Sequence, residues 1–220
     1  GVEGTFEAAA PKAFDDVVVR YDPPLPGSGP ERVPAAYQQV KWHVDTGGRF
    51  GYEDLVDPDF IGATSVSLLQ RLRDAKKTAP AGARFDFVTT YRIKDSDPLS
   101  YVQSGTDKSI LLGRLCDGTT DRSRMGKVRK LWREHLGFAS DDELKEIVTG
   151  LRIMDGERSL EQLREDINVR AQIVGALTCS TESDFRYDGL PKALKSRKLN
   201  SFTREAMRQI LREEGLLTDN

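Results

Sequence analysis

Hydrophobic and polar positions along the chain predict strands first and helices afterwards. Three consecutive valines between aromatic residues predict a strand over residues 14–21, and residues 35–44 (AAYQQVKWHV) predict a second strand. Five prolines and two glycines in residues 22–34 predict a long loop between them. The two segments are therefore typical of a hairpin.

Leucine and alanine then recur at helical spacing from residue 64 onward, and residues 83–93 (ARFDFVTTYRI) predict another strand. The rest of the chain favours helices, which we expect at residues 109–115, at residues 122–136 and from about Thr203 to Gly215. Two further helices should begin at capping boxes, one of Ser140 with Glu143 and one of Ser159 with Gln162. This order predicts an α/β fold, with a strand-bearing lobe in residues 1–104 and a mostly helical lobe in residues 105–220.

Composition places the chain among proteins that fold in water. Its 220 residues are 38% hydrophobic and 31% charged, which suits one large domain or a domain with an appendage. No run of about 18 apolar residues and no secretory signal is present, so we expect a cytoplasmic protein without a membrane segment. Because the sequence starts at Gly1 rather than at Met, we expect that upstream residues are missing.

Charge and metal-binding residue types narrow the function classes. The 33 basic and 35 acidic residues give a net charge of -2, so nucleic-acid binding has to rest on local clusters. Only two cysteines, Cys116 and Cys179, and two histidines, His43 and His135, are present, and they show no zinc-binding spacing. We therefore expect no structural zinc.

Two clusters of cations are candidates for phosphate contact. The denser cluster comprises Arg122, Arg124, Lys127, Arg129, Lys130 and Arg133. A buried helical stripe of Met125, Val128, Trp132 and Leu136 predicts that most of these cations face outward. The second cluster comprises Lys192, Lys195, Arg197, Lys198 and Arg204. Solvated helix faces account for such clusters more often than phosphate contact does, and we expect Trp42 and Trp132 to be core aromatics.

The candidate chemistry lies on the first two predicted strands. If Val17 and Val19 share the core with Val40 and Trp42, alternation along each strand places Asp16 on the same face as Gln39 and Lys41. This arrangement clusters an acid, an amide and an amine at one surface of the sheet. A solvated strand face without chemistry is the alternative.

Such a cluster suits phosphodiester hydrolysis. Cleavage needs a hard cation with oxygen ligands, which Asp16 and Gln39 offer, and a positive charge such as Lys41 near the attacking water. Because Gln39 is neutral, we expect a further acid from Glu3, Glu7 or an upstream residue. Neighbouring Asp15 is either a strand-entry residue or a ligand.

At these residues the sequence resembles the PD-(D/E)xK, restriction-endonuclease-like nucleases of bacterial anti-phage defence, in a variant with QxK in place of ExK. The resemblance rests on FDDVVV before QVK, on RFDFVTTYRI, on SLEQLREDINVRAQIVGAL and on SFTREAMRQILREEGLL, and it covers nearly the whole chain. The usual proline before the acid is replaced by Phe14 and Asp15, and the helix that often precedes the first strand is not in this chain.

The resemblance implies a restriction-endonuclease-like mixed sheet with flanking helices. It further implies a metal-dependent endonuclease that cleaves double-stranded DNA with Mg²⁺ or Mn²⁺, with Asp16, Gln39 and Lys41 as catalytic residues and with Asp16, Gln39 and Asp15 as metal ligands. A fused or companion ATPase and a homo-oligomer are the implied partners. Two alternatives remain open, namely a non-catalytic assembly domain that binds the ATPase and a DNA-binding helical domain without cleavage.

Overall fold

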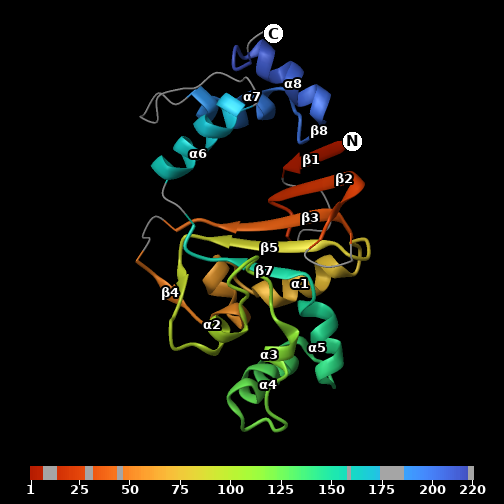
Figure 1. Cartoon of the computed structure of the whole chain (residues 1–220), viewed down its shortest axis with the longest axis vertical. Coiled ribbons are helices and arrows are strands. Elements are labelled where there is room, and N and C mark those ends of the chain that lie inside the picture. Colours follow the sequence, from red (N-terminus) through yellow and green to blue (C-terminus); the bar gives the residue numbers. More distant parts are fainter. Residues whose placement is uncertain (7–13, 28–31, 44–46, 158–159, 174–185, 218–220) are drawn as a thin grey trace.

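A six-stranded sheet forms the centre of the molecule (Figure 1). The structure is a computed structural model, and it describes residues 1–6, 14–27, 32–43, 47–157, 160–173 and 186–217. Its strands are, in spatial order, β7 (Leu151–Met154), β5 (Arg84–Thr89), β3 (Arg32–Lys41), β2 (Val17–Pro26), β1 (Val2–Phe6) and β8 (Ser201–Thr203). A separate pair consists of β4 (Arg49–Phe50) and β6 (Arg92–Ile93).

The sheet is mixed. β2 pairs with β1 and β3 in antiparallel register, whereas β3, β5 and β7 run parallel to one another. The predicted hairpin and the α/β class are therefore confirmed. β7 and β8 both follow residue 104, so the sheet takes strands from both sides of the expected border.

Strands extend into part of the proline-rich segment that the sequence predicts as loop. β2 continues to Pro26 and β3 begins at Arg32, with a register shift between Arg20 and Leu25. Pro23 and Pro24 have no N–H group to donate, and such residues are tolerated in strands mainly at irregularities of this kind.

Helices follow the predicted order with shorter bounds. They are α1 (Leu68–Lys76), α2 (Pro98–Val102), α3 (Leu112–Leu115), α4 (Arg124–Leu136), α5 (Asp141–Val148), α6 (Leu160–Ile173), α7 (Leu190–Ser196) and α8 (Arg204–Glu213), with 3-10 turns η1 (Asp54–Val56), η2 (Pro58–Ile61) and η3 (Arg186–Gly189). Ser140 and Glu143 form the predicted capping box of α5, and Thr203 caps α8. Ser159 lies outside the described residues.

One face of the sheet meets α1 to α5 in the hydrophobic core. Val18, Tyr37, Phe85 and Ile153 point to this face and are buried, together with leucines of α1 and with Trp132 of α4. The expectation that Val40 and Trp42 belong to the core is wrong, because these side chains are 38% and 41% exposed on the opposite face.

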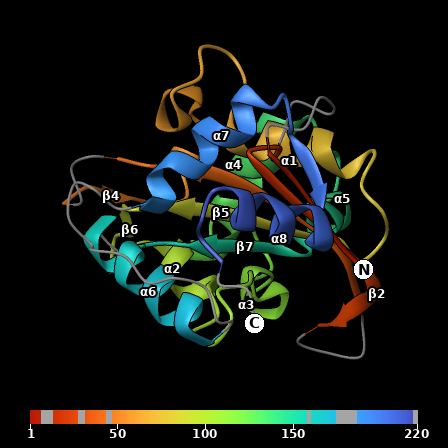
Figure 2. The ribbon, with the colours of Figure 1, turned by 90° about the horizontal axis from the view of Figure 1, so that it is seen from above.

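The elements are arranged along one long axis. α6, α7 and α8 lie together at one end and α4 lies at the other, with the sheet between them (Figure 1). Viewed along that axis, α6 to α8 form the layer nearest the viewer (Figure 2). Within the described residues, no helix has the length and apolar character needed to cross a membrane.

Candidate functional site

The side chains of Asp16 and Gln39 are in direct contact at the end of the β2–β3 ladder. The last paired residues are Val17 and Gln38, and beyond them the Asp16 carboxylate takes the place of a backbone acceptor. Asp16 Oδ2 accepts hydrogen bonds from the Val40 N–H at 2.6 Å and from Gln39 Nε2 at 2.5 Å. Because a strand N–H without a partner is costly, this bond fixes the acid beside β3.

Gln39 lies on the face of the sheet that meets the helices and is only 7% exposed. Its Oε1 accepts a hydrogen bond from Arg71 Nη1 of α1 at 3.0 Å, so both ends of the amide are satisfied. The sequence analysis places Asp16, Gln39 and Lys41 on the solvent face, away from the core. The structure instead forms an Asp16–Gln39–Arg71 chain that faces the helix layer.

Arg71 is the residue of this chain that the sequence analysis misses. It lies next to the buried positions Leu68, Leu72 and Ala75 on α1, which the helical spacing of the sequence does predict. A buried glutamine requires partners for both ends of its amide, but the sequence alone gives no indication that Gln39 is buried.

Lys41 points to the same side of β3 as Gln39, about 6.6 Å farther along the strand. Its Nζ lies beside Gly62, where a Cβ atom would approach it to 2.6 Å. Gly62 has a φ of 68° and ends η2, so a glycine both permits this turn and leaves space for the lysine. Among the described residues, Lys41 Nζ has neither an ion pair nor a hydrogen bond.

Of the acids expected to complete a metal site, only Glu3 lies among the described residues, and it is not beside Asp16. Glu3 pairs in register with Arg20, about 10 Å along the sheet from Val17, and accepts a hydrogen bond from Ser201. Glu7 lies outside the described residues, and Asp15 is half-buried next to Asp16. Within the described ranges no group of three His, Cys, Asp or Glu side chains is arranged to hold a metal.

The donor atoms at Asp16 nevertheless suit a hard cation. Both hydrogen bonds of the carboxylate end on Oδ2, and Oδ1 accepts none from the described part of the chain. Mg²⁺ is often bound by one or two carboxylates together with water and substrate phosphate, so Asp16 provides the minimum protein contribution. The Gln39 oxygen is turned to Arg71 in this structure.

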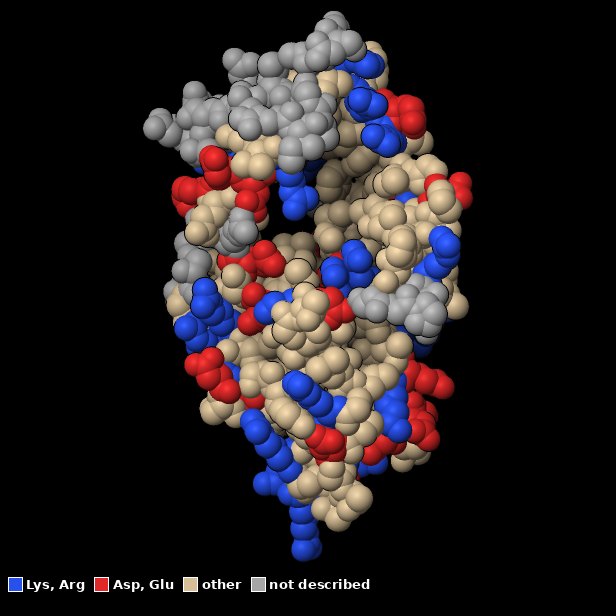
Figure 3. All heavy atoms as spheres, viewed as in Figure 1, with Lys and Arg blue, Asp and Glu red and all other residues tan. Residues whose placement is uncertain are grey.

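A cleft of about 660 Å³ opens beside Asp16 between the sheet and α7. Its lining includes Asp16 and Val40 on the sheet side, and Leu194, Lys195 and Lys198 on the α7 side. The space-filling view shows the molecule hollowed between the end that carries α6 to α8 and the sheet (Figure 3). Two cations of the second predicted cluster, Lys195 and Lys198, therefore border a cleft that Asp16 also lines, on the Val40 side of β3.

The first cluster of cations lies on and beside α4, at the far end of the long axis (Figure 1). Most of these cations face outward as expected, whereas Arg129 is only 4% exposed. Its guanidinium bonds the carbonyls of Leu115, Asp117 and Gly118 and the carboxylate of Asp141.

Of the other cations in this cluster, Arg133 pairs with Asp121 and Asp141, at 3.0 and 3.1 Å. Lys130 lies 3.8 Å from Glu134, and Arg124 bonds the carbonyl of Ser96. Arg122 and Lys127 are exposed. Much of the positive charge that the sequence displays here is therefore neutralised or bonded within the protein.

Comparison with known proteins gives one informative similarity. No family model matches the chain. The chain is similar to CD-NTase-associated protein 4 of Enterobacter hormaechei subsp. hoffmannii (strain UCI 50), with 51% identity over 214 residues. The aligned region is 97% of this chain but 43% of that relative, so the chain spans less than half of the length of the protein it resembles.

Proposed function

We propose that this chain is a metal-dependent endonuclease module that cleaves double-stranded DNA in anti-phage defence. The observation that carries the proposal is the contact of the Asp16 carboxylate with Gln39, with Lys41, whose amine has no ion pair among the described residues, two residues farther along the same face. An acid, an amide and an amine at the end of two paired strands suit phosphodiester hydrolysis.

Asp16, with Gln39 and Asp15, would hold Mg²⁺ or Mn²⁺. When bound, such an ion neutralises charge on the phosphate and lowers the pKa of a coordinated water. The residues of the chain act around it. The Val40 N–H and Gln39 Nε2 orient the carboxylate, the Gln39 oxygen would turn from Arg71 to the ion, and Lys41 would stabilise the negative charge that develops on the phosphate.

The biological setting is proposed from two sources. The similar Enterobacter protein is by its name associated with a CD-NTase, and we propose an association of the same kind here. The resemblance to defence nucleases supports a role against phage, a fused or companion ATPase and a homo-oligomeric assembly.

Replacing Lys41 tests the proposed site. We expect Lys41→Met to lower the rate of nicking of supercoiled plasmid with Mn²⁺ or Mg²⁺ by at least about 100-fold, the usual cost of removing one group that stabilises a transition state. Methionine retains most of the aliphatic volume beside Gly62, so the melting temperature should stay within about 2 °C of the parent protein.

Lys127→Met is the matched control, because Lys127 is exposed on α4 far from the cleft. We expect it to cut at the parental rate, and EDTA should stop cutting by both the parent and the control. Unchanged nicking by Lys41→Met would show that the site is wrongly assigned.

A non-catalytic assembly domain is the second candidate. The neutral Gln39 and the use of its oxygen by Arg71 favour this function. Calorimetric titration with Mn²⁺ separates the two, because a nuclease should bind the ion in an Asp16-dependent manner. For a scaffold, the parent protein and Asp16→Asn should give the same heat on addition of Mn²⁺.

A further inference from the structure

The small ribbon of β4 and β6 carries two arginines side by side on its outer face. Arg49 of β4 and Arg92 of β6 are partners in the parallel register, and so are Phe50 and Ile93. Phe50 and Ile93 are buried in the core, so the alternation of side chains along a strand turns both arginines outward. Both arginines are exposed, and we call them the arginine pair.

No acid of the described part of the chain neutralises the arginine pair. Neither Arg49 nor Arg92 forms an ion pair there, and the hydrogen bonds of Arg49 Nη1 end on the carbonyls of Gly47 and Gly48. Like charges opposite each other on neighbouring strands are destabilising. An external anion would remove this repulsion, and the guanidinium fork matches phosphate with parallel N–H donors.

Elsewhere in the same protein, neighbouring arginines do have an acid between them. Arg152 of β7 donates to both oxygens of Asp86 on β5, at 2.7 and 2.9 Å. Arg84 lies 3.3 Å from the same carboxylate, which is almost completely buried. The fold therefore satisfies these two arginines internally, whereas it leaves the arginine pair to solvent.

The arginine pair is tied to the end of β3 that carries Lys41. Two residues after Lys41, the His43 N–H donates to Thr90 Oγ1 at 3.1 Å, and the Thr90 hydroxyl donates to the His43 carbonyl at 3.0 Å. The rings of His43 and Tyr91 stack with their centroids 3.6 Å apart. Arg92 follows Tyr91 directly, so these contacts fix its position relative to Lys41.

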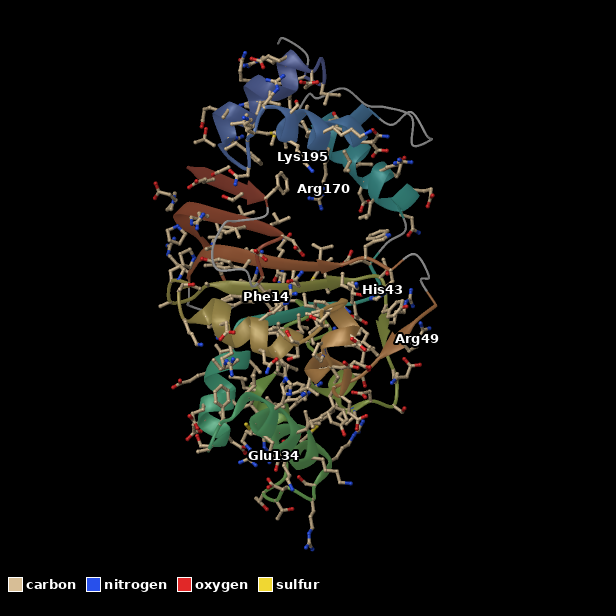
Figure 4. The ribbon with its side chains drawn as sticks, turned by 180° about the vertical axis from the view of Figure 1, so that it is seen from behind. Phe14, His43, Arg49, Glu134, Arg170 and Lys195 are labelled. Atoms are coloured by element: carbon tan, nitrogen blue, oxygen red, sulfur yellow. The ribbon has the colours of Figure 1, made fainter. Side chains whose placement is uncertain are left out.

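The separation suits two contacts with one DNA duplex. Lys41 is the register partner of Thr89, and Arg92 is three residues farther along the chain. The Cα atoms of Lys41 and Arg92 are therefore at most about 16 Å apart, which is about five steps of 3.4 Å between phosphates along one strand. Figure 4 shows Arg49 at the same end of the sheet as His43.

We propose that the arginine pair binds the phosphate backbone of duplex DNA a few base pairs from the bond that is cut near Lys41. This inference rests on the proposed function, since it names the surface that positions the same substrate. Contacts to phosphate hold the duplex in place but do not read its sequence, so the arginine pair adds affinity for any duplex. The ribbon of β4 and β6, rather than α4, is then the cationic surface for the substrate.

Binding to duplex DNA without divalent metal tests this surface separately from cleavage. A fluorescein-labelled duplex of about 20 base pairs is titrated in EDTA with the parent protein, with Arg49→Gln/Arg92→Gln and with the control Arg122→Gln/Lys127→Gln. Each variant removes two exposed charges that form no ion pair within the described residues, so each should melt within about 2 °C of the parent.

We expect the arginine-pair variant to lose at least about tenfold in affinity at about 0.1 M salt. The slope of log affinity against log salt should become shallower by about 1.8, the contribution of two phosphate contacts with a duplex. The α4 control should stay within about twofold of the parent. Failure of the parent to bind, unchanged binding by the arginine-pair variant, an equal loss in the control, or competition by inorganic phosphate as strong as by unlabelled duplex would each overturn the inference.

The outcomes also separate the two proposals. A protein that binds the duplex through the arginine pair but cuts nothing with Mn²⁺ would retain this surface and lose the proposed function. An arginine-pair variant that nicks subsaturating plasmid at the parental rate would retain the proposed function and lose this surface.

Discussion

The cations of α4 and those of α7 look alike in the sequence but differ in what their side chains contact. On α4, Arg129 is enclosed by three carbonyls and a carboxylate, and Arg133 pairs with two acids. On α7 and the turn after it, Lys195 and Lys198 face a cleft without an ion partner among the described residues. The denser cluster is therefore the one whose cations are bonded to other groups of the protein.

The difference arises from the neighbours of each helix. α4 packs among α1, α3 and α5, so cations at its borders meet backbone carbonyls at the end of α3 and the acidic first turn of α5. α7 borders an opening. Local charge density therefore says little about ligand binding until the surroundings of each side chain are known.

Removing Arg129 is the strongest test of this comparison. We expect Arg129→Met to lower the free energy of unfolding by about 3 kcal/mol, because several buried acceptors lose their donor. Urea denaturation followed by circular dichroism measures the change. Lys127→Met, at an exposed position of the same helix, should change stability by less than about 0.5 kcal/mol.

The opposite outcome would break the comparison. If Arg129→Met were as stable as the parent but lost affinity for DNA, Arg129 would be a ligand-binding residue, and α4 would be the contact surface.

The sequence predicts the elements better than it predicts their faces. The hairpin, α1, the capping box of α5 and the buried stripe of α4 all follow from local patterns, and the structure confirms them. Local patterns do not predict which side of β3 meets the helices. Tyr37 and Gln39 lie on one side and Val40 and Trp42 on the other, so both sides carry apolar residues. Tyr37 stacks on Phe85 in the core, a contact between strands 48 residues apart that no local pattern contains.

The candidate site shows the same limit. Alternation along the strands predicts that Asp16, Gln39 and Lys41 share a face, and the Asp16–Gln39 contact agrees with that expectation. Arg71 and the α7 lysines come from elements distant in the sequence, and only the fold brings them to Gln39 and to the cleft beside Asp16, respectively. The roles of these residues in catalysis and metal binding stay predictions.

At the Asp16–Gln39 contact, replacing Arg71 should strengthen metal binding rather than weaken the fold. Arg71 holds the oxygen of Gln39, which a cation at Asp16 would also need. We expect Arg71→Met to raise the affinity for Mn²⁺ about fivefold, equivalent to about 1 kcal/mol, when measured by calorimetry without DNA. Arg73→Met is the control, because Arg73 contacts Asp74 and the Leu136 carbonyl instead. Weaker Mn²⁺ binding by Arg71→Met would mean that Gln39 does not act as a ligand.

The smallest expected effect concerns the bond that ties the end of α4 to the start of α1. Ser67 Oγ, the buried N-cap of α1, lies 2.7 Å from His135 Nε2. Burial, and secondarily the charge of Arg73, lower the pKa of His135 below its ordinary value of 6.5. The neutral ring is therefore favoured in the fold, where it shares a hydrogen bond with the Ser67 hydroxyl.

The pH dependence of stability follows from this preference. Because the unfolded chain takes up the proton first as the pH falls, the contribution of His135 is complete above about pH 7.5 and declines through pH 6.5 and below. We expect the parent to lose up to about 1 kcal/mol of unfolding free energy between pH 7.5 and 5.5, roughly one hydrogen bond. His135→Gln, which accepts the same bond without titrating, should flatten this decline, whereas His43→Gln should not. An unchanged decline in His135→Gln would assign the pH dependence to other groups. The Ser67–His135 hydrogen bond between α1 and α4 would then not contribute to it.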